Sequence, residues 1–116
     1  MNDGPYLDVI KQASTDVATF VAGASKDVLA KDDLRSSAVL FQLTLMGESA
    51  LRVSEQTRQR HPEIDWTGLA RTGSMCVERY YDIDWDIVWN AATIDAPTLG
   101  QQVAHILSEE FPEVED

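Results

Sequence analysis

The sequence contains one cysteine, Cys76, among its 116 residues. A single cysteine excludes an intramolecular disulfide and any zinc site built from cysteines. Because Cys76 lies in an apolar run, we expect it to be a small buried core residue. The scarcity of cysteine is typical of a protein from a reducing compartment.

Positive charge is also scarce, since 9 Lys and Arg stand against 20 Asp and Glu and the formal net charge is −11. Nucleic-acid phosphates and anionic lipids bind clustered Lys and Arg, so this balance argues against DNA and membrane partners. Part of the negative charge belongs to an acidic tail over residues 108–116. Local positive positions remain at residues 58–61 and at Arg79. The charge therefore predicts no DNA or membrane partner and no general basic groove.

No apolar run approaches the roughly 18 residues that a membrane-spanning helix needs. The first four residues also lack the basic segment that opens a signal peptide. We therefore expect a cytoplasmic location.

Alternation of apolar and polar residues, the pattern of a half-buried strand, does not persist for even five positions, and no repeat is present. Apolar residues recur instead at helical spacing. The spacing predicts helices over residues 5–22, 33–55 and 66–80, a fourth helix after Asp84 and a last helix from residue 95. Residues 26–30 form a short turn, and residues 57–65 form a polar connection with an exposed His61. The prediction is a single all-α domain over residues 1–116, a bundle of four or five helices.

Gly47 interrupts the longest predicted helix. Glycine costs about 1 kcal/mol relative to alanine in a helix interior. Close approach of another backbone would explain it, and a tolerated glycine is the alternative. The wide apolar stripe of this helix predicts burial against a sister helix or a partner chain.

Three carboxylates alternate at Asp82, Asp84 and Asp86, an arrangement that could offer oxygen ligands to a cation. The segment fails as an EF-hand, because Ile87 replaces the required glycine and Thr93 the required glutamate. Acids at a helix start explain the three residues without a metal. Both histidines lack a second ligand nearby. The sequence therefore predicts no metal site and no cofactor.

A second interpretation of the same acids starts from Gly73-Ser74 followed by Asp84-Trp85-Asp86. This spacing resembles the signature of minimal nucleotidyltransferases, in which the carboxylates hold magnesium on a nucleotide phosphate. That signature requires a turn and a strand in a mixed sheet. The surrounding sequence predicts no strand, so a nucleotidyltransferase is the third alternative for function.

A broader resemblance covers nearly the whole chain. Four segments resemble, in order and spacing, the HepT-like HEPN proteins, the toxin half of MNT/HEPN toxin–antitoxin modules. The segments are Tyr6-Leu7-Asp8-Val9-Ile10, Leu45-Met46-Gly47-Glu48-Ser49-Ala50, Arg60-His61-Pro62-Glu63-Ile64-Asp65-Trp66 and Tyr80-Tyr81-Asp82-Ile83-Asp84-Trp85-Asp86-Ile87-Val88-Trp89. The resemblance implies a HEPN-like helical bundle, a homodimer, an MNT-type nucleotidyltransferase antitoxin as partner and metal-independent endoribonuclease activity on RNA.

The family's catalytic motif is Arg, four to six residues, His, one residue and Tyr. In this sequence the Arg position holds Gly73, the His position holds Glu78, and the Tyr position is kept as Tyr80. Arg71 precedes Glu78 by a permitted spacing, and seven positions on a helix differ by only about 20° in direction. Arg71 and Glu78 are therefore the candidate substitutes. A glutamate can serve as a base, but its negative charge repels the RNA phosphate.

These departures leave two functions open. One is the endoribonuclease of the family, and the other is a catalytically inactive dimeric module that binds the nucleotidyltransferase or a nucleotide. By the resemblance, Tyr80 is also the residue that the antitoxin modifies with AMP. Alternatively, Tyr80 and Tyr81 pack over the tryptophans that follow. Glu48, Arg79 and Tyr81 are candidate cleft-lining residues, although Glu48 could instead form an interhelical hydrogen bond.

Overall fold

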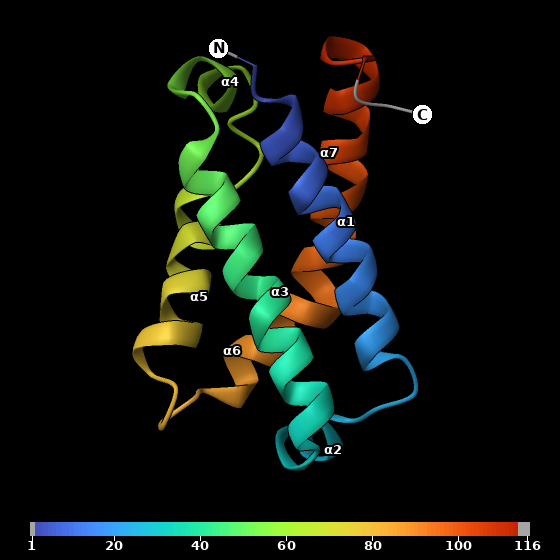
Figure 1. The fold of residues 1–116 in the computed structure, drawn as a ribbon, viewed down its shortest axis with the longest axis vertical. Helices are drawn as coiled ribbons and strands as arrows, with labels where there is room; N and C mark the ends of the chain where they lie inside the picture. Colours follow the sequence, from blue (N-terminus) through green and yellow to red (C-terminus); the bar gives the residue numbers. More distant parts are fainter. Residues whose placement is uncertain (1, 114–116) are drawn as a thin grey trace.

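The computed structural model describes residues 2–113, and every regular element in that part of the chain is helical (Figure 1). The predicted all-α class is confirmed. The part of the predicted acidic tail beyond residue 113 lies outside the described residues. None of the described helices is long and apolar enough to cross a membrane. The elements are α1 (Gly4–Val21), α2 (Lys26–Lys31), α3 (Asp33–Arg52), α4 (Glu55–Arg60), α5 (Trp66–Glu78), α6 (Trp85–Asn90), η1 (Ala91–Asp95) and α7 (Ala96–Glu110).

The starts of several helices follow from capping side chains in the sequence. The Asp65 side chain accepts a hydrogen bond from the backbone N–H of Gly68 at 2.9 Å and begins α5. Asp84 likewise accepts from the backbone N–H groups of Asp86 and Ile87 and begins α6. Such a cap satisfies a backbone donor that has no partner inside the helix. Both predicted starts are confirmed.

The predicted helix over residues 33–55 is too long, because α3 ends at Arg52. Val53 takes an extended conformation, and Ser54 then caps a separate helix, α4, by accepting a hydrogen bond from the Thr57 N–H. The segment predicted as a polar connection, residues 57–65, therefore begins inside a helix. Residues 55–60 are all polar, so the sequence lacks the apolar spacing that would predict α4.

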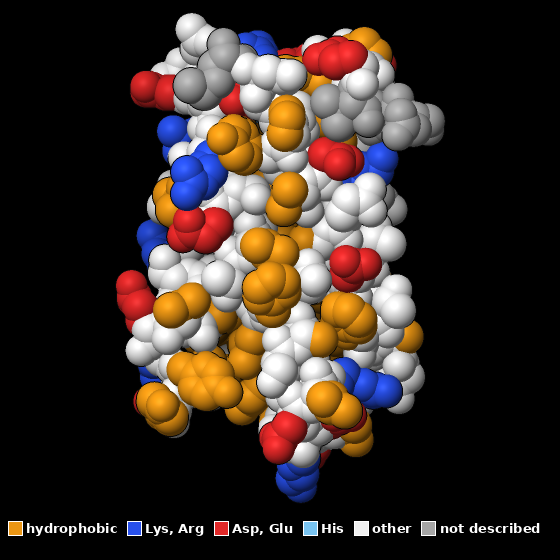
Figure 2. Space-filling model, in the orientation of Figure 1, with side chains coloured by type: hydrophobic (Ala, Val, Ile, Leu, Met, Phe, Trp, Pro, Cys, Tyr) orange, Lys and Arg blue, Asp and Glu red, His pale blue; other side chains and the backbone are white. Residues whose placement is uncertain are grey.

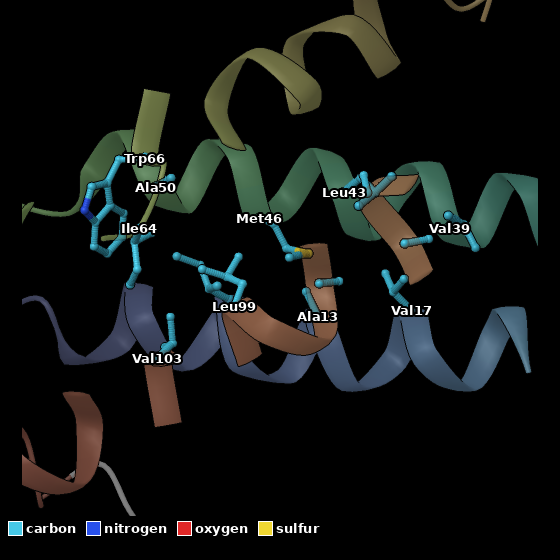
Figure 3. Close-up of a cluster of buried hydrophobic side chains, with 14 of the residues drawn as sticks. Ala13, Val17, Val39, Leu43, Met46, Ala50, Ile64, Trp66, Leu99 and Val103 are labelled. Atoms are coloured by element: carbon cyan, nitrogen blue, oxygen red, sulfur yellow. The ribbon is translucent and has the colours of Figure 1, made fainter. Parts of the chain in front are cut away.

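The long helices form the bundle. Helix α3 packs between α1 and α5, and α7 packs on the other side of α1 (Figure 1). Figure 3 shows α3 and α1 side by side, with the side chain of Met46 extending from α3 into the space between them. The core includes twelve large side chains that are almost fully buried: Leu7, Ile10, Val17, Leu29, Val39, Leu43, Met46, Val53, Val88, Val103, Ile106 and Leu107. Complete burial of one such side chain stabilises the fold by about 1.5–3 kcal/mol.

Helices α3 and α5 meet through two glycines. A Cβ atom added to Gly47 would lie 2.9 Å from the Cα atom of Gly73, and one added to Gly73 would lie 3.0 Å from the Cα atom of Gly47. Real Cβ atoms hardly ever approach so closely. The predicted close approach of another backbone at Gly47 is therefore confirmed, and its partner is Gly73.

The predicted fourth and last helices are continuous in the structure, because η1, a single π-helical turn, joins α6 directly to α7. Asn90, Ala91, Asp95 and Ala96 all keep right-handed helical angles. The Ala96 N–H bonds the carbonyl of Ala91, which is the longer ring of a π-helix. Such turns are rare and occur often at functional sites.

One end of the bundle is held by six polar side chains, here named the polar clasp: Asp3, Ser54, Thr57, Arg60, His61 and Glu110. The group connects the start of α1, all of α4 and the last turn of α7, which lie at the same end in Figure 1. Asp3 is only 2% exposed and accepts hydrogen bonds from the hydroxyls of Ser54 and Thr57, both at 2.6 Å.

Glu110 forms the other half of the polar clasp. Its carboxylate accepts from Arg60 at 2.7 Å and contacts the His61 Nε2 atom at 2.5 Å. The His61 Nδ1 atom lies 3.4 Å from Glu63. The prediction of an exposed loop histidine is therefore wrong. The side chain is 17% exposed, because a residue 49 positions away in the sequence covers it.

Candidate functional site

The exposed face of α5 carries two of the predicted catalytic residues. Arg71, Ser74 and Glu78 are all exposed and follow one another at spacings of three and four residues. They therefore share one face of the helix. Within residues 2–113, the side chains of Arg71 and Glu78 form no hydrogen bond and no ion pair. Both side chains are available to a partner or a substrate.

Gly73, which the sequence resemblance predicts to stand at the position of the motif arginine, does not lie on that face. It is buried against Gly47 of α3, with the carbonyl of Leu43 3.1 Å from the position of a Cβ atom. A side chain at position 73 would point into the α3 backbone in this helix register. The positive charge nearest in sequence is therefore that of Arg71, two residues earlier.

The turn after α5, residues 79–84, carries the predicted modification site. Tyr80 is 60% exposed and Tyr81 is fully exposed. Their rings meet edge to face, with centroids 5.3 Å apart and planes at 76°. Packing of both rings over the tryptophans that follow, the alternative for this pair, is therefore wrong. Arg79 lies beside them and donates a hydrogen bond to Asp82 at 3.0 Å.

Glu48 lies on the exposed side of α3. Its side chain is 60% exposed and lies 3.8 Å from Arg52, one turn later on the same helix. The alternative of an interhelical hydrogen bond is therefore wrong. Glu48 shares its helix with exposed apolar residues, because Leu34 is 87%, Phe41 59% and Leu51 56% exposed. Figure 2 shows apolar side chains running down the middle of the face on which α3 lies in front.

The histidines and the cysteine add no group to the exposed face of α5. His61 belongs to the polar clasp, and His105 lies on α7, a helix that packs on α1. Cys76 is 3% exposed, which confirms the prediction of a core residue. Burial raises the pKa of its thiol to about 11, so the thiol stays protonated at neutral pH and is a poor nucleophile.

The three alternating carboxylates have structural partners. Asp82 pairs with Arg79, Asp84 caps α6, and Asp86 forms an ion pair with Lys26 at 2.5 Å. Among the described residues no group of His, Cys, Asp and Glu is arranged to hold a metal ion. The same part of the chain contains no strand, so the minimal nucleotidyltransferase, which needs a mixed sheet, is wrong.

Two features of the site region were not anticipated. The polar clasp joins residues about 50 positions apart, and only the Ser54 cap of α4 gives a local signal for it. A groove between α5 and the η1–α7 segment also has no local signal, because residues 43–102 contribute to it from several elements.

Comparison with known proteins places the chain in a family. Residues 10–106 match the family described as Ribonuclease HepT-like, and the chain belongs to it. The predicted resemblance is confirmed. No solved structure matches the chain significantly.

Relatives with similar names align over most of their length. The chain is 26% identical to a protein of Caldanaerobacter subterraneus subsp. tengcongensis named as a candidate RNase, over 91% of this chain and 95% of the relative. It is 23% identical to a Methanocaldococcus jannaschii protein that is also named as a candidate RNase, over 90% of this chain and 86% of the relative. It is also 26% identical to the probable ribonuclease HepT of Thermococcus cleftensis, over 81% and 86%.

Proposed function

We propose that this chain is the HepT-type subunit of a cytoplasmic toxin–antitoxin module. In this proposal it acts as a catalytically inactive homodimer that binds an MNT-type nucleotidyltransferase antitoxin. The observation that carries the loss of catalysis is the environment of residue 73. Gly73 offers no side chain, and its position faces the backbone of Gly47 rather than the exposed face of α5.

Glu78 supports the same proposal. Metal-independent RNA cleavage needs a group that takes the 2′-hydroxyl proton and a group that returns a proton to the leaving oxygen. It also needs positive charge near the phosphorane. Glu78 places an acidic side chain on the exposed face, where its negative charge repels the phosphate. The net charge of −11 opposes RNA binding further.

The exposed side of α3 supports a homodimer. Leu34, Phe41 and Leu51 leave apolar surface in water on a helix that already packs on α1 and α5. Exposed apolar patches of this kind mark interaction surfaces. Light scattering should report a dimer for the wild type and a monomer for Phe41→Asp. A wild-type monomer at about 100 μM would contradict this part of the proposal, since specific dimers generally form well below that concentration.

The exposure of Tyr80 supports modification by the partner. In AMP transfer the phenolic oxygen attacks the α-phosphorus of ATP, its proton leaves to a base, and the bond to the departing pyrophosphate breaks. Tyr80 is 60% exposed, so its hydroxyl can be reached. Co-expression with an active nucleotidyltransferase should add the mass of AMP to the wild type and to Tyr81→Phe. Tyr80→Phe should stay unmodified, and modification of that variant would move the site elsewhere.

The second candidate function is residual endoribonuclease activity, favoured by the common exposed face of Arg71 and Glu78. The test is incubation of purified protein with a structured RNA in the presence of EDTA. We expect the wild type to cleave no faster than buffer alone. Cleavage that Arg71→Ala or Glu78→Ala abolishes, while Ser74→Ala on the same face keeps it, would replace the inactive module by the ribonuclease.

A further inference from the structure

A groove runs between α5 and the η1–α7 segment. Its volume is about 340 Å³, within the range of small-molecule sites. The groove exists because α5 packs chiefly on α3 while α7 packs chiefly on α1, so the two helices flank a gap. Its floor includes Leu43, Met46 and Leu99, three residues of the apolar core that Figure 3 labels.

The rim of the groove is acidic. Glu63, Asp65 and Asp95 are among the lining residues, and no Lys, Arg or His lines the groove within residues 2–113. The Glu63 carboxylate lies 3.4 Å from the Nδ1 atom of His61. The backbone N–H of Gly68 occupies one oxygen of Asp65 at 2.9 Å. The Asp95 side chain does not cap α7 and forms no hydrogen bond or ion pair in the same part of the chain. Negative charge beside an apolar floor is complementary to a cation that carries an apolar body.

The π-helical turn forms one wall of the groove. Ala91, Ile94 and Asp95 of η1 all line it, and Ile94 leaves 62% of its side chain in water. A π-turn within a helix is rare and is often kept at a binding site. Here it brings an exposed apolar side chain and an exposed carboxylate to the same rim.

We propose that this groove binds a small amphipathic amine, with its apolar body on the core residues and its ammonium group beside Asp95. The volume equals that of about ten waters, so it suits a molecule of roughly a dozen non-hydrogen atoms. The site is separate from the candidate site above. Neither Arg71, Glu78 nor Tyr80 lines the groove.

Three probes of nearly equal size and shape test the proposal. These are 4-phenylbutylamine, 4-phenylbutanol and 4-phenylbutyrate, which end in a positive ammonium, a neutral hydroxyl and a negative carboxylate. Each is titrated into isotopically labelled protein, and backbone amide shifts are followed by NMR. The amine should give saturable shifts at residues 64–72 and 91–99. Its affinity should exceed those of the alcohol and the acid by about tenfold.

Matched variants locate the charge. Asp95→Asn should weaken amine binding about fivefold and leave binding of the alcohol unchanged. Asp16→Asn removes an exposed carboxylate of α1 that does not line the groove, so it should change the binding of neither probe. Shifts that scatter over the surface, or equal affinity for all three probes, would overturn the proposal. So would an unchanged amine affinity in a folded Asp95→Asn protein.

Discussion

The two ends of the bundle use their polar residues in opposite ways. At one end, the six side chains of the polar clasp bind one another and connect α1, α4 and α7. At the other end, the turn over residues 79–84 exposes Tyr80 and Tyr81, whose aromatic rings contact each other edge to face. The first end is built to hold the fold. The second is available to another molecule.

Helix α5 connects the two ends. Its first turn lies near the polar clasp, because the indole N–H of Trp66 donates to the carbonyl of His61 at 3.0 Å. Further along, the helix is held against α3 by the contact of Gly73 with Gly47. The exposed residues Arg71 and Glu78 therefore sit on a helix that is fixed from behind. This arrangement suits a surface for binding, because a fixed helix loses little entropy when a partner docks.

The largest expected effect comes from breaking the polar clasp at its buried carboxylate. Asp3→Ala should lower the free energy of unfolding by about 3 kcal/mol, since it removes the charged acceptor for Ser54 and Thr57. Urea unfolding followed by circular dichroism measures it. Asp16→Ala, on the exposed side of the same helix, should stay within about 0.5 kcal/mol of wild type. Equal losses of unfolding free energy in the two variants would show that the polar clasp does not stabilise the fold.

Acid should weaken the same end selectively. Burial raises the pKa of Glu110, but the bonds from Arg60 and His61 outweigh it and the net pKa is lowered from 4.5. Burial likewise raises the pKa of Asp3, and hydrogen bonds from Ser54 and Thr57 reverse that shift, lowering the pKa from 3.8. A lowered folded-state pKa stabilises the fold above the unfolded value, and this stability disappears as pH falls through the folded value.

The free energy of unfolding, measured from pH 6 to about pH 3, should therefore begin to fall near pH 4.5 and continue to fall below pH 3.8. Glu110→Gln should flatten the upper part of this profile. Asp86→Asn removes an exposed ion-pair partner of Lys26 and serves as the control. An identical profile in wild type and Glu110→Gln would contradict the assignment.

The sequence predicted those parts of the fold that local signals specify. The capping residues Asp65 and Asp84 predict where α5 and α6 begin. The helical spacing of apolar residues in α1, α3 and α7 predicts that these helices pack into a bundle. Helix α4 escaped prediction because its residues are all polar and its stability depends on the distant Asp3. His61 was misjudged for the same reason, since its partner Glu110 lies 49 positions away.

The candidate site was predicted unevenly. Arg71, Glu78 and Tyr80 are all exposed, as a role in binding or modification requires. Gly47 was expected to meet another backbone, but its partner could not be found from spacing alone. The sequence marks Gly73 only as a position where the family motif has arginine. In the structure Gly73 allows α5 to pack closely against α3. The role of a residue at such a position depends on contacts between helices, which local sequence spacing does not show.

A smaller effect is expected where α5 is fixed away from the polar clasp. Gly73→Ala gains about 1 kcal/mol of helix propensity, but its Cβ atom would lie 3.0 Å from Gly47 and 3.1 Å from the Leu43 carbonyl. Overpacking should outweigh the gain and give a net loss of about 1 kcal/mol in unfolding free energy. Ser74→Ala, next along the helix and exposed, should be slightly stabilising. A stabilised Gly73→Ala protein would show that the two helices separate easily.

The smallest effect on stability should come from the exposed turn. Tyr81 is fully exposed, so Tyr81→Ala should change the free energy of unfolding by less than about 0.5 kcal/mol in dilute protein. The measurement is repeated at low and high protein concentration, because a second copy that covers Tyr81 would stabilise the wild type by mass action. A loss confined to high concentration would place Tyr81 in a contact between copies. A loss of 1 kcal/mol or more at every concentration would contradict the contrast between the two ends, since the turn would then hold the fold as the polar clasp does.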